Sequence, residues 1–194
     1  MKKLNFDLIL LGDPTSGKDT QGRLLNKIYK SRLAQSGVYL RNLIRKKKAA
    51  ADLVKSYNRG LPVPSKYIDQ FLKDSLLKAG SRSVIFVGTP KLKREAEFLV
   101  KNFKKQGRDF FVIYIKLPLK LILKRSHLRN RENLDIKRNL LKNRINYHKK
   151  EVGETVNYFR SLNKIRFVQG NKPIAKVTKE LVKIINDYQK FQGN

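Results

Sequence analysis

The sequence has no cysteine, and its histidines are limited to His127 and His148. A chain without cysteine forms no disulfide, offers no thiolate nucleophile and builds no cysteine-ligated zinc site. Two histidines are also too few for a histidine-based metal centre, so we expect no zinc. This composition suits a reducing compartment, and a cytoplasmic location is the expectation.

Long hydrophobic runs are missing as well. The stretch from Leu8 to Leu11 is apolar and follows Lys2 and Lys3, but Asp7 interrupts the pattern and the run is too short for a secretion signal. A membrane-spanning helix needs about 20 apolar residues, and no segment approaches that length. We therefore expect no membrane partner.

Acidic residues are scarce, because 15 Asp and Glu stand against 45 Lys and Arg and leave a net charge of +30. This imbalance indicates anionic partners such as nucleotides, nucleic acid or acidic lipid head groups, and it predicts salt-sensitive, non-specific binding to polyanions. Hydrophobic residues make up 40% of the 194 residues, which is enough for a folded domain with its own core. We expect residues 1–194 to form a single domain and a monomer.

Short apolar runs alternate with longer amphipathic ones, as in βα units wrapped around a parallel sheet. The pattern predicts strands at 7–11, 32–35, 83–87, 110–115 and 165–168. It predicts helices at 18–29, 38–57, 65–78, 92–106, 119–130, 134–161 and 173–191. The expected fold class is α/β, a three-layer fold with a five-stranded parallel sheet flanked by helices. In such sheets the loops after the carboxyl ends of the strands carry ligands.

The loop after the first strand matches the first seven positions of a P-loop, with Gly12 and Gly17 five apart and Lys18 directly after. In this motif backbone N–H groups and the amino end of a helix surround phosphates, while the lysine contacts the outer ones. Asp19 occupies the eighth position, where Ser or Thr is usual. A plain polar turn is the alternative. The motif predicts a P-loop NTPase-like fold and an ATP site made of Gly12, Thr15, Ser16, Gly17, Lys18, Asp19 and Thr20.

Further motifs follow in order along nearly the whole chain, and together they resemble the adenylate kinase family of nucleoside monophosphate kinases. The loop is similar to the family's Gly-x-Pro-Gly-x-Gly-Lys-Gly-Thr-Gln, with Thr15 and Asp19 in place of two glycines. Residues 35–41 resemble Ser-Thr-Gly-Asp-Met-Leu-Arg, and residues 60–64 resemble Gly-Lys-Leu-Val-Thr. Residues 87–91 are similar to Asp-Gly-Phe-Pro-Arg, and residues 169–174 to Asp-Gly-Thr-Lys-Pro-Val.

The resemblance implies transfer of the γ-phosphoryl group of ATP to a nucleoside monophosphate, with AMP as the first choice. It implies catalytic roles for Lys18, Arg125, Arg129 and Arg144, and it adds Arg125 and Lys172 to the ATP site. It assigns the acceptor site to Ser36, Arg41, Pro62, Val63, Gly88, Lys91 and Glu95. Segment 36–65 corresponds to the helical monophosphate-binding insertion, and residues 129–135 to a minimal lid that is too short to bind zinc.

The chain departs from the family pattern at several site positions. The family ends its third strand with an aspartate that orients Mg²⁺ through water, and Val87 stands there in this chain. We expect Asp19 to contact the Mg²⁺ that comes with ATP, because a carboxylate oxygen suits a hard cation; loss of the metal function is the alternative. Lys91 replaces an arginine, which keeps the charge but loses the bidentate fork. Glu95 replaces a glutamine that reads the base, and it either accepts a hydrogen bond from an amino group of adenine or cytosine or is a solvated helix residue.

Two classes of function are compatible with these observations. The first is a nucleoside monophosphate kinase, with activity reduced by the departures. The second is a catalytically weakened protein of the same fold that binds RNA or a ribonucleoprotein through its basic surface. Few aromatic residues lie between the lysines, so the sequence offers no stacking platform for single strands.

Overall fold

The five strands form one parallel sheet. The structure is a computed structural model that describes residues 3–129 and 134–191, and the side chains of residues 127–140 are not described. The strand order is β2-β3-β1-β4-β5. The strands are β1 (Asp7–Gly12), β2 (Arg32–Gln35), β3 (Val84–Val87), β4 (Phe110–Lys116) and β5 (Ile165–Gln169). Each predicted strand agrees with an observed one to within one residue at either end.

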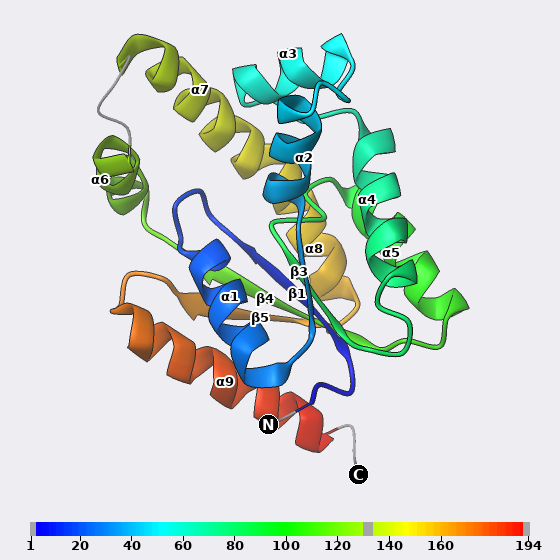
Figure 1. The fold of residues 1–194 in the computed structure, drawn as a ribbon. Helices are drawn as coiled ribbons and strands as arrows, with labels where there is room; N and C mark the ends of the chain where they lie inside the picture. The colour runs from blue at the N-terminus through cyan, green and yellow to red at the C-terminus, as the bar shows by residue number, and fades with distance from the viewer. Residues whose placement is uncertain (1–2, 130–133, 192–194) are drawn as a thin grey trace.

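Helices cover both faces of the sheet and produce the predicted three layers (Figure 1). One core packs Leu8 and Leu10 of β1 against α1 (Lys18–Tyr29) and α9 (Ile174–Phe191). The other core contains Ile9 and Leu11 together with side chains of α4 (Ser65–Leu77), α5 (Lys93–Lys105) and α8 (Gly153–Ser161). Successive residues of a strand point to opposite faces, so one short apolar run supplies both cores.

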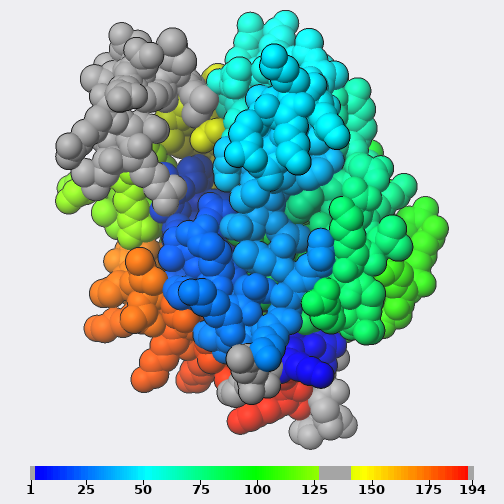
Figure 2. Space-filling view, in the orientation of Figure 1, coloured from blue at the N-terminus to red at the C-terminus, as the bar shows by residue number. Residues whose placement is uncertain are grey.

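The single helix predicted for residues 38–57 is wrong, since the structure divides this stretch into α2 (Ser36–Arg45) and α3 (Ala51–Arg59). The break follows from the basic run 46–48, which offers no apolar side chain to bury, and from Lys47, whose φ of 53° is incompatible with a right-handed helix. In the space-filling view α1, α2 and α3 form one continuous surface on this side of the molecule (Figure 2).

The long helix predicted for residues 134–161 is present, with one irregular turn in the middle. It consists of α7 (Leu134–Tyr147), a π-helical turn η1 (His148–Val152) and α8. A separate helix, α6 (Leu119–Arg129), follows β4. Among the described residues, no helix has both the length and the apolar character needed to cross a membrane.

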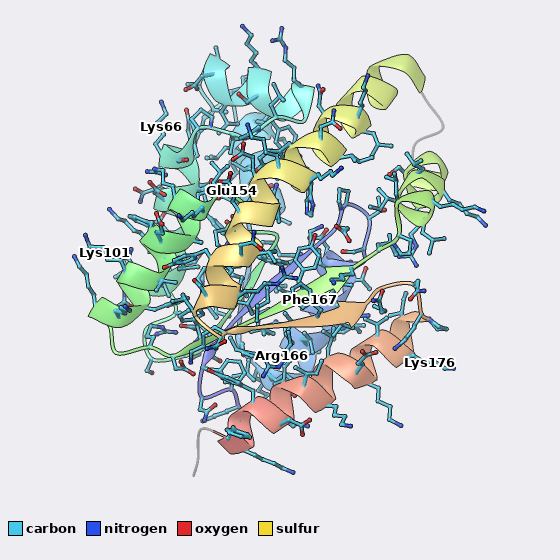
Figure 3. The ribbon with its side chains drawn as sticks, turned by 180° about the vertical axis from the view of Figure 1, so that it is seen from behind. Lys66, Lys101, Glu154, Arg166, Phe167 and Lys176 are labelled. Carbon is cyan, nitrogen blue, oxygen red and sulfur yellow. The ribbon has the colours of Figure 1, made fainter. Side chains whose placement is uncertain are left out.

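Strand β5 forms one edge of the sheet, where Arg166 and Phe167 are seen from behind in Figure 3. The Phe167 ring lies between two cations, with Lys116 Nζ 4.3 Å and Arg160 Cζ 4.8 Å from its centroid. Charged side chains along an edge strand discourage pairing with a further strand. This basic edge therefore protects the sheet.

Candidate nucleotide-binding site

A cavity of about 370 Å³ opens at the carboxyl ends of β1 and β3. Open parallel sheets bind ligands at this edge, where the connections from two adjacent strands cross to opposite faces of the sheet. Most of the site residues predicted from the sequence line it: Gly12, Thr15, Lys18, Asp19, Ser36, Arg41, Pro62, Val63, Gly88, Lys91, Glu95 and Arg144. Residues from five separate segments thus meet in one place.

The phosphate loop has a backbone that only small residues adopt easily. Gly17, with φ of 89°, precedes the first turn of α1, and a Cβ on Gly12 would lie 2.7 Å from the Ile115 carbonyl oxygen. Thr15 has φ of 59°, a left-handed conformation that costs a β-branched residue free energy. The Thr15 backbone thus has the conformation that suits the glycine of the family motif.

Lys18 and Ser16 occupy the interior of the loop. Lys18 Nζ donates to the Asp13 carbonyl oxygen at 3.2 Å, and its Cε lies 3.5 Å from where a Cβ of Gly88 would be. Gly88 has φ of 74°, a left-handed conformation that favours glycine, whereas the contact with Lys18 alone would leave room for a Cβ. Ser16 is buried, and its Oγ has no hydrogen-bond partner among the described residues.

A cluster of cations faces the cavity from three elements. Arg41 comes from α2, Arg144 from α7 and Lys91 from the loop after β3. Partial desolvation by the surrounding protein lowers the pKa of the Arg144 guanidinium, which keeps access to solvent, and repulsion by Arg41 lowers it further. Desolvation by the surrounding protein also lowers the pKa of Lys91, although Lys91 has access to solvent through the cavity. Among the described residues, neither Arg41 nor Arg144 has a carboxylate within ion-pair distance.

Glu95 lines the cavity but is only 3% exposed. Its Oε2 accepts hydrogen bonds from the backbone N–H groups of Lys91 (2.9 Å) and Leu92 (3.3 Å), which caps the amino end of α5. Burial raises the pKa of Glu95, and these two hydrogen bonds oppose the rise. The solvated-helix alternative for Glu95 is therefore wrong, and contact of Oε1 with a base stays a prediction.

Ser36 is another buried residue of the cavity lining. Its hydroxyl donates to the Gly88 carbonyl oxygen at 3.3 Å and so ties the start of α2 to the end of β3. Pro62 and Val63 belong to the loop after α3 and also line the cavity.

Other predicted residues lie outside the cavity lining. Arg125 bridges two loops, with Nη1 donating to the Thr15 carbonyl oxygen at 3.3 Å and Nη2 to that of Gly170 at 3.1 Å. Lys172 forms an ion pair with Glu180 on α9, at 2.7 Å. The Arg129 side chain and residues 130–133 of the predicted lid lie outside the part of the chain that the structure describes.

A polar network around Asp13 of the phosphate loop was not predicted from the sequence. Asp13 Oδ1 accepts the Tyr114 hydroxyl proton at 2.7 Å, and Asp13 Oδ2 accepts the Leu117 N–H at 2.6 Å. Burial and the bond to Asp13 raise the pKa of Tyr114, which stays protonated as the donor. His148 contacts the same loop, with Nε2 3.1 Å from the Gly12 carbonyl oxygen. The position of Asp13 in a glycine-rich loop was the one signal of this network in the sequence, and its partners Tyr114 and Leu117 lie in a distant segment of the chain.

The long helix braces several parts of the site at once. Asn143 donates to the Arg59 carbonyl oxygen at 3.0 Å, which connects α7 to α3. Thr155 on α8 donates to the Lys91 carbonyl oxygen at 2.7 Å. Together with His148, these contacts connect one helix to the phosphate loop, to the end of α3 and to the loop after β3.

The fold and this site define a P-loop nucleotide-binding protein of the phosphotransferase type. A sequence model of the AAA domain family matches residues 11–141, and the chain belongs to that family. Curated relatives include adenylate kinases of Orientia tsutsugamushi (strain Ikeda), 24% identical over 220 residues, with 96% of this chain and 100% of the relative covered. The adenylate kinase of Prochlorococcus marinus (strain MIT 9301) is 24% identical, with 90% and 95% covered. That of Dehalococcoides mccartyi (strain ATCC BAA-2266) is 27% identical, with 93% and 98% covered. The chain is a member of the adenylate kinase family.

Proposed function

We propose that this protein transfers the γ-phosphoryl group of ATP to a nucleoside monophosphate, with AMP as the acceptor and two molecules of ADP as the product. The observation that carries the proposal is the convergence of Lys18, Arg41 and Arg144 on a cavity beside the phosphate loop. Phosphoryl transfer depends mainly on positioning and on neutralising charge, and these residues supply both. The adenylate kinase relatives support the same activity.

Each cation has a distinct role in this proposal. Lys18 and the loop amides bind the donor phosphates, and Arg41 with Lys91 binds the phosphate of the acceptor. Arg144 lines the same cavity and stabilises the charge that develops during transfer. Arg125 holds the Thr15 and Gly170 carbonyl oxygens together in the structure, and we infer that ATP binding redirects its guanidinium toward the donor. Segment 36–65 closes the acceptor side, and residues 129–135 form the lid.

Asp19 is the proposed protein contact for Mg²⁺. Its exposed carboxylate lies on the first turn of α1 beside Lys18 and lines the cavity. Asp19 Oδ1 accepts a long hydrogen bond from Gln35 Nε2, at 3.5 Å. Among the described residues no group of three or more acidic or histidine side chains is placed to hold a metal, so the substrate phosphates must supply most ligands. Mg²⁺ commonly binds in this way, through one or two carboxylates plus phosphates, and when bound it neutralises phosphate charge.

An Mg²⁺ titration of phosphotransfer tests this role. Asp19→Ala is expected to raise the Mg²⁺ concentration required for half-maximal activity, whereas Lys101→Ala, on the outer side of α5 (Figure 3), is expected to leave it unchanged. An unchanged metal requirement in Asp19→Ala defeats the assignment.

A coupled assay for ADP formation tests the function, with AMP, CMP, UMP and GMP supplied separately. We expect AMP to be the best acceptor. An RNA-binding titration at two salt concentrations tests the alternative derived from the net charge, which predicts tight binding that weakens steeply as salt rises. RNA binding without ADP formation from any acceptor would reverse the preference.

A further inference from the structure

The imidazole of His148 stands between the backbone of the phosphate loop and an acidic side chain of that loop. Nε2 is 3.1 Å from the Gly12 carbonyl oxygen, and Nδ1 is 3.7 Å from Asp13 Oδ1. A carbonyl oxygen only accepts hydrogen bonds, so Nε2 must carry a proton and donate. In a neutral imidazole the lone pair of Nδ1 then faces the Asp13 carboxylate. A second proton on Nδ1 would turn this contact into an attractive one between an N–H donor and a carboxylate acceptor.

The backbone at His148 is itself unusual. His148 begins the π-helical turn η1, which interrupts the otherwise regular helix formed by α7 and α8. Single π-helical turns inside α-helices occur frequently at functional sites, because the extra residue redirects side chains. Here the irregular turn coincides with the residue that contacts the phosphate loop.

We propose that His148 is a positioning residue that holds the start of the phosphate loop, and that its Nδ1 takes up a proton from solvent when a nucleotide polyphosphate fills the loop. The inference rests on the proposed function only in requiring that ATP bind there. Asp13 is already oriented to receive the new N–H, because Tyr114 and Leu117 fix both of its oxygens.

The charges around His148 explain why the proton arrives with the ligand. Burial lowers the pKa of His148 to about 4, and Lys18 and Lys91 oppose protonation, while Asp13 and the Gly12 carbonyl favour it. Tyr114, whose ring centroid is 6.1 Å away, is neutral. Phosphate groups beside Lys18 counter the two cations that disfavour the imidazolium. The pKa of His148 therefore rises on binding, and affinity for ATP increases as the pH falls.

Isothermal titration calorimetry of the full chain with Mg²⁺-ATP, in two buffers of different ionisation enthalpy, measures the proton uptake. His148→Gln is the decisive variant, because its carboxamide N–H can still donate to Gly12 but the side chain cannot take a second proton. At about pH 5.5 the wild type is expected to take up more protons than His148→Gln, and at about pH 8 equally many. A return of the pKa from about 4 to its ordinary value of 6.5 makes the gain in affinity at low pH roughly tenfold larger for the wild type.

A second variant, His148→Leu, removes the donor as well and is expected to bind ATP more weakly than His148→Gln at both pH values. Equal proton uptake and an equal pH dependence of affinity in the wild type and His148→Gln overturn the proposal, even if ATP binds well. A lack of ATP binding by the wild type at either pH overturns the proposed function, and this inference with it. The two failures are therefore distinguishable.

Discussion

Asp7 and Arg108 form a two-point ion pair at the end of the sheet opposite the cavity, with Nε–Oδ2 and Nη2–Oδ1 distances of 2.7 and 2.8 Å. Asp7 is 1% exposed, and its Oδ1 also accepts the Val84 N–H at 2.7 Å. Arg108 donates further to the carbonyl oxygens of Gly80 and Arg82. One ion pair thus joins β1, β3 and the loops that lead into β3 and β4.

Removing one partner of this pair leaves a buried charge without compensation. Arg108→Met is expected to lower the free energy of unfolding by about 3 to 5 kcal/mol. Urea denaturation of the wild type and the variant measures the difference. Arg94→Met, which breaks an exposed pair with Asp69, is the control and is expected to cost under about 1 kcal/mol. Equal effects of the two substitutions would contradict the structural role of Arg108.

Thr15 holds a left-handed backbone that glycine adopts without strain. Thr15→Gly is expected to raise the free energy of unfolding by about 1 kcal/mol, since relief of the strain exceeds the entropy that glycine adds to the unfolded chain. Thr15→Ala keeps a Cβ and is expected to change stability by less than about 0.5 kcal/mol. Thermal unfolding of the three proteins tests this, and a destabilised glycine variant would show that the Thr15 side chain matters more than its backbone.

The mutual repulsion of Arg41 and Arg144 predicts a conflict between stability and function. Arg144→Met is expected to leave stability unchanged or slightly increased, because it removes the repulsion of Arg41 from a side chain that is otherwise exposed to solvent, yet to lower kcat about 10²- to 10³-fold. Arg41→Met is expected to raise KM for the monophosphate more than KM for ATP. Arg166→Met, at the exposed edge of the sheet in Figure 3, serves as the control for lost charge. A kcat of Arg144→Met equal to that of the control rules out its catalytic role.

The unliganded protein should lose stability on acidification through His148. The folded-state pKa is about 4 and the ordinary value is 6.5, so the unfolded chain binds the proton more strongly between these limits. Stability therefore rises as the pH increases from 4 to 6.5, and the His148 contribution lost at about pH 4.5 is about 2 kcal/mol. Urea denaturation at about pH 4.5 and 7 is expected to show a larger decrease for the wild type than for His148→Gln. The same decrease in both proteins excludes a buried, neutral imidazole.

The sequence predicted the features that depend on local pattern. The apolar runs located β1, β3, β4 and β5, and the glycine spacing with Lys18 located the phosphate loop. The break at Lys47 was not predicted, because lysine favours a helix by intrinsic propensity and a short basic run has the same composition in a solvated loop as on a helix surface. The contacts of Asp13 and His148 were also missed. Their partners lie 101 to 136 residues away in the chain, and only the folded sheet brings them together.

The most direct test of the proposed phosphoryl transfer is a ³¹P nuclear magnetic resonance time course of ATP, AMP and Mg²⁺ with the purified protein. ADP resonances are expected to grow as those of ATP and AMP decline. The rate is expected to be at least about 10²-fold lower for Lys18→Met, because the donor phosphates lose their main cation. Lys176→Met, which removes an exposed lysine near the start of α9 (Figure 3), should react at the wild-type rate. An unchanged mixture with the wild-type protein, or equal rates for the Lys18 and Lys176 variants, would rule out transfer at this site.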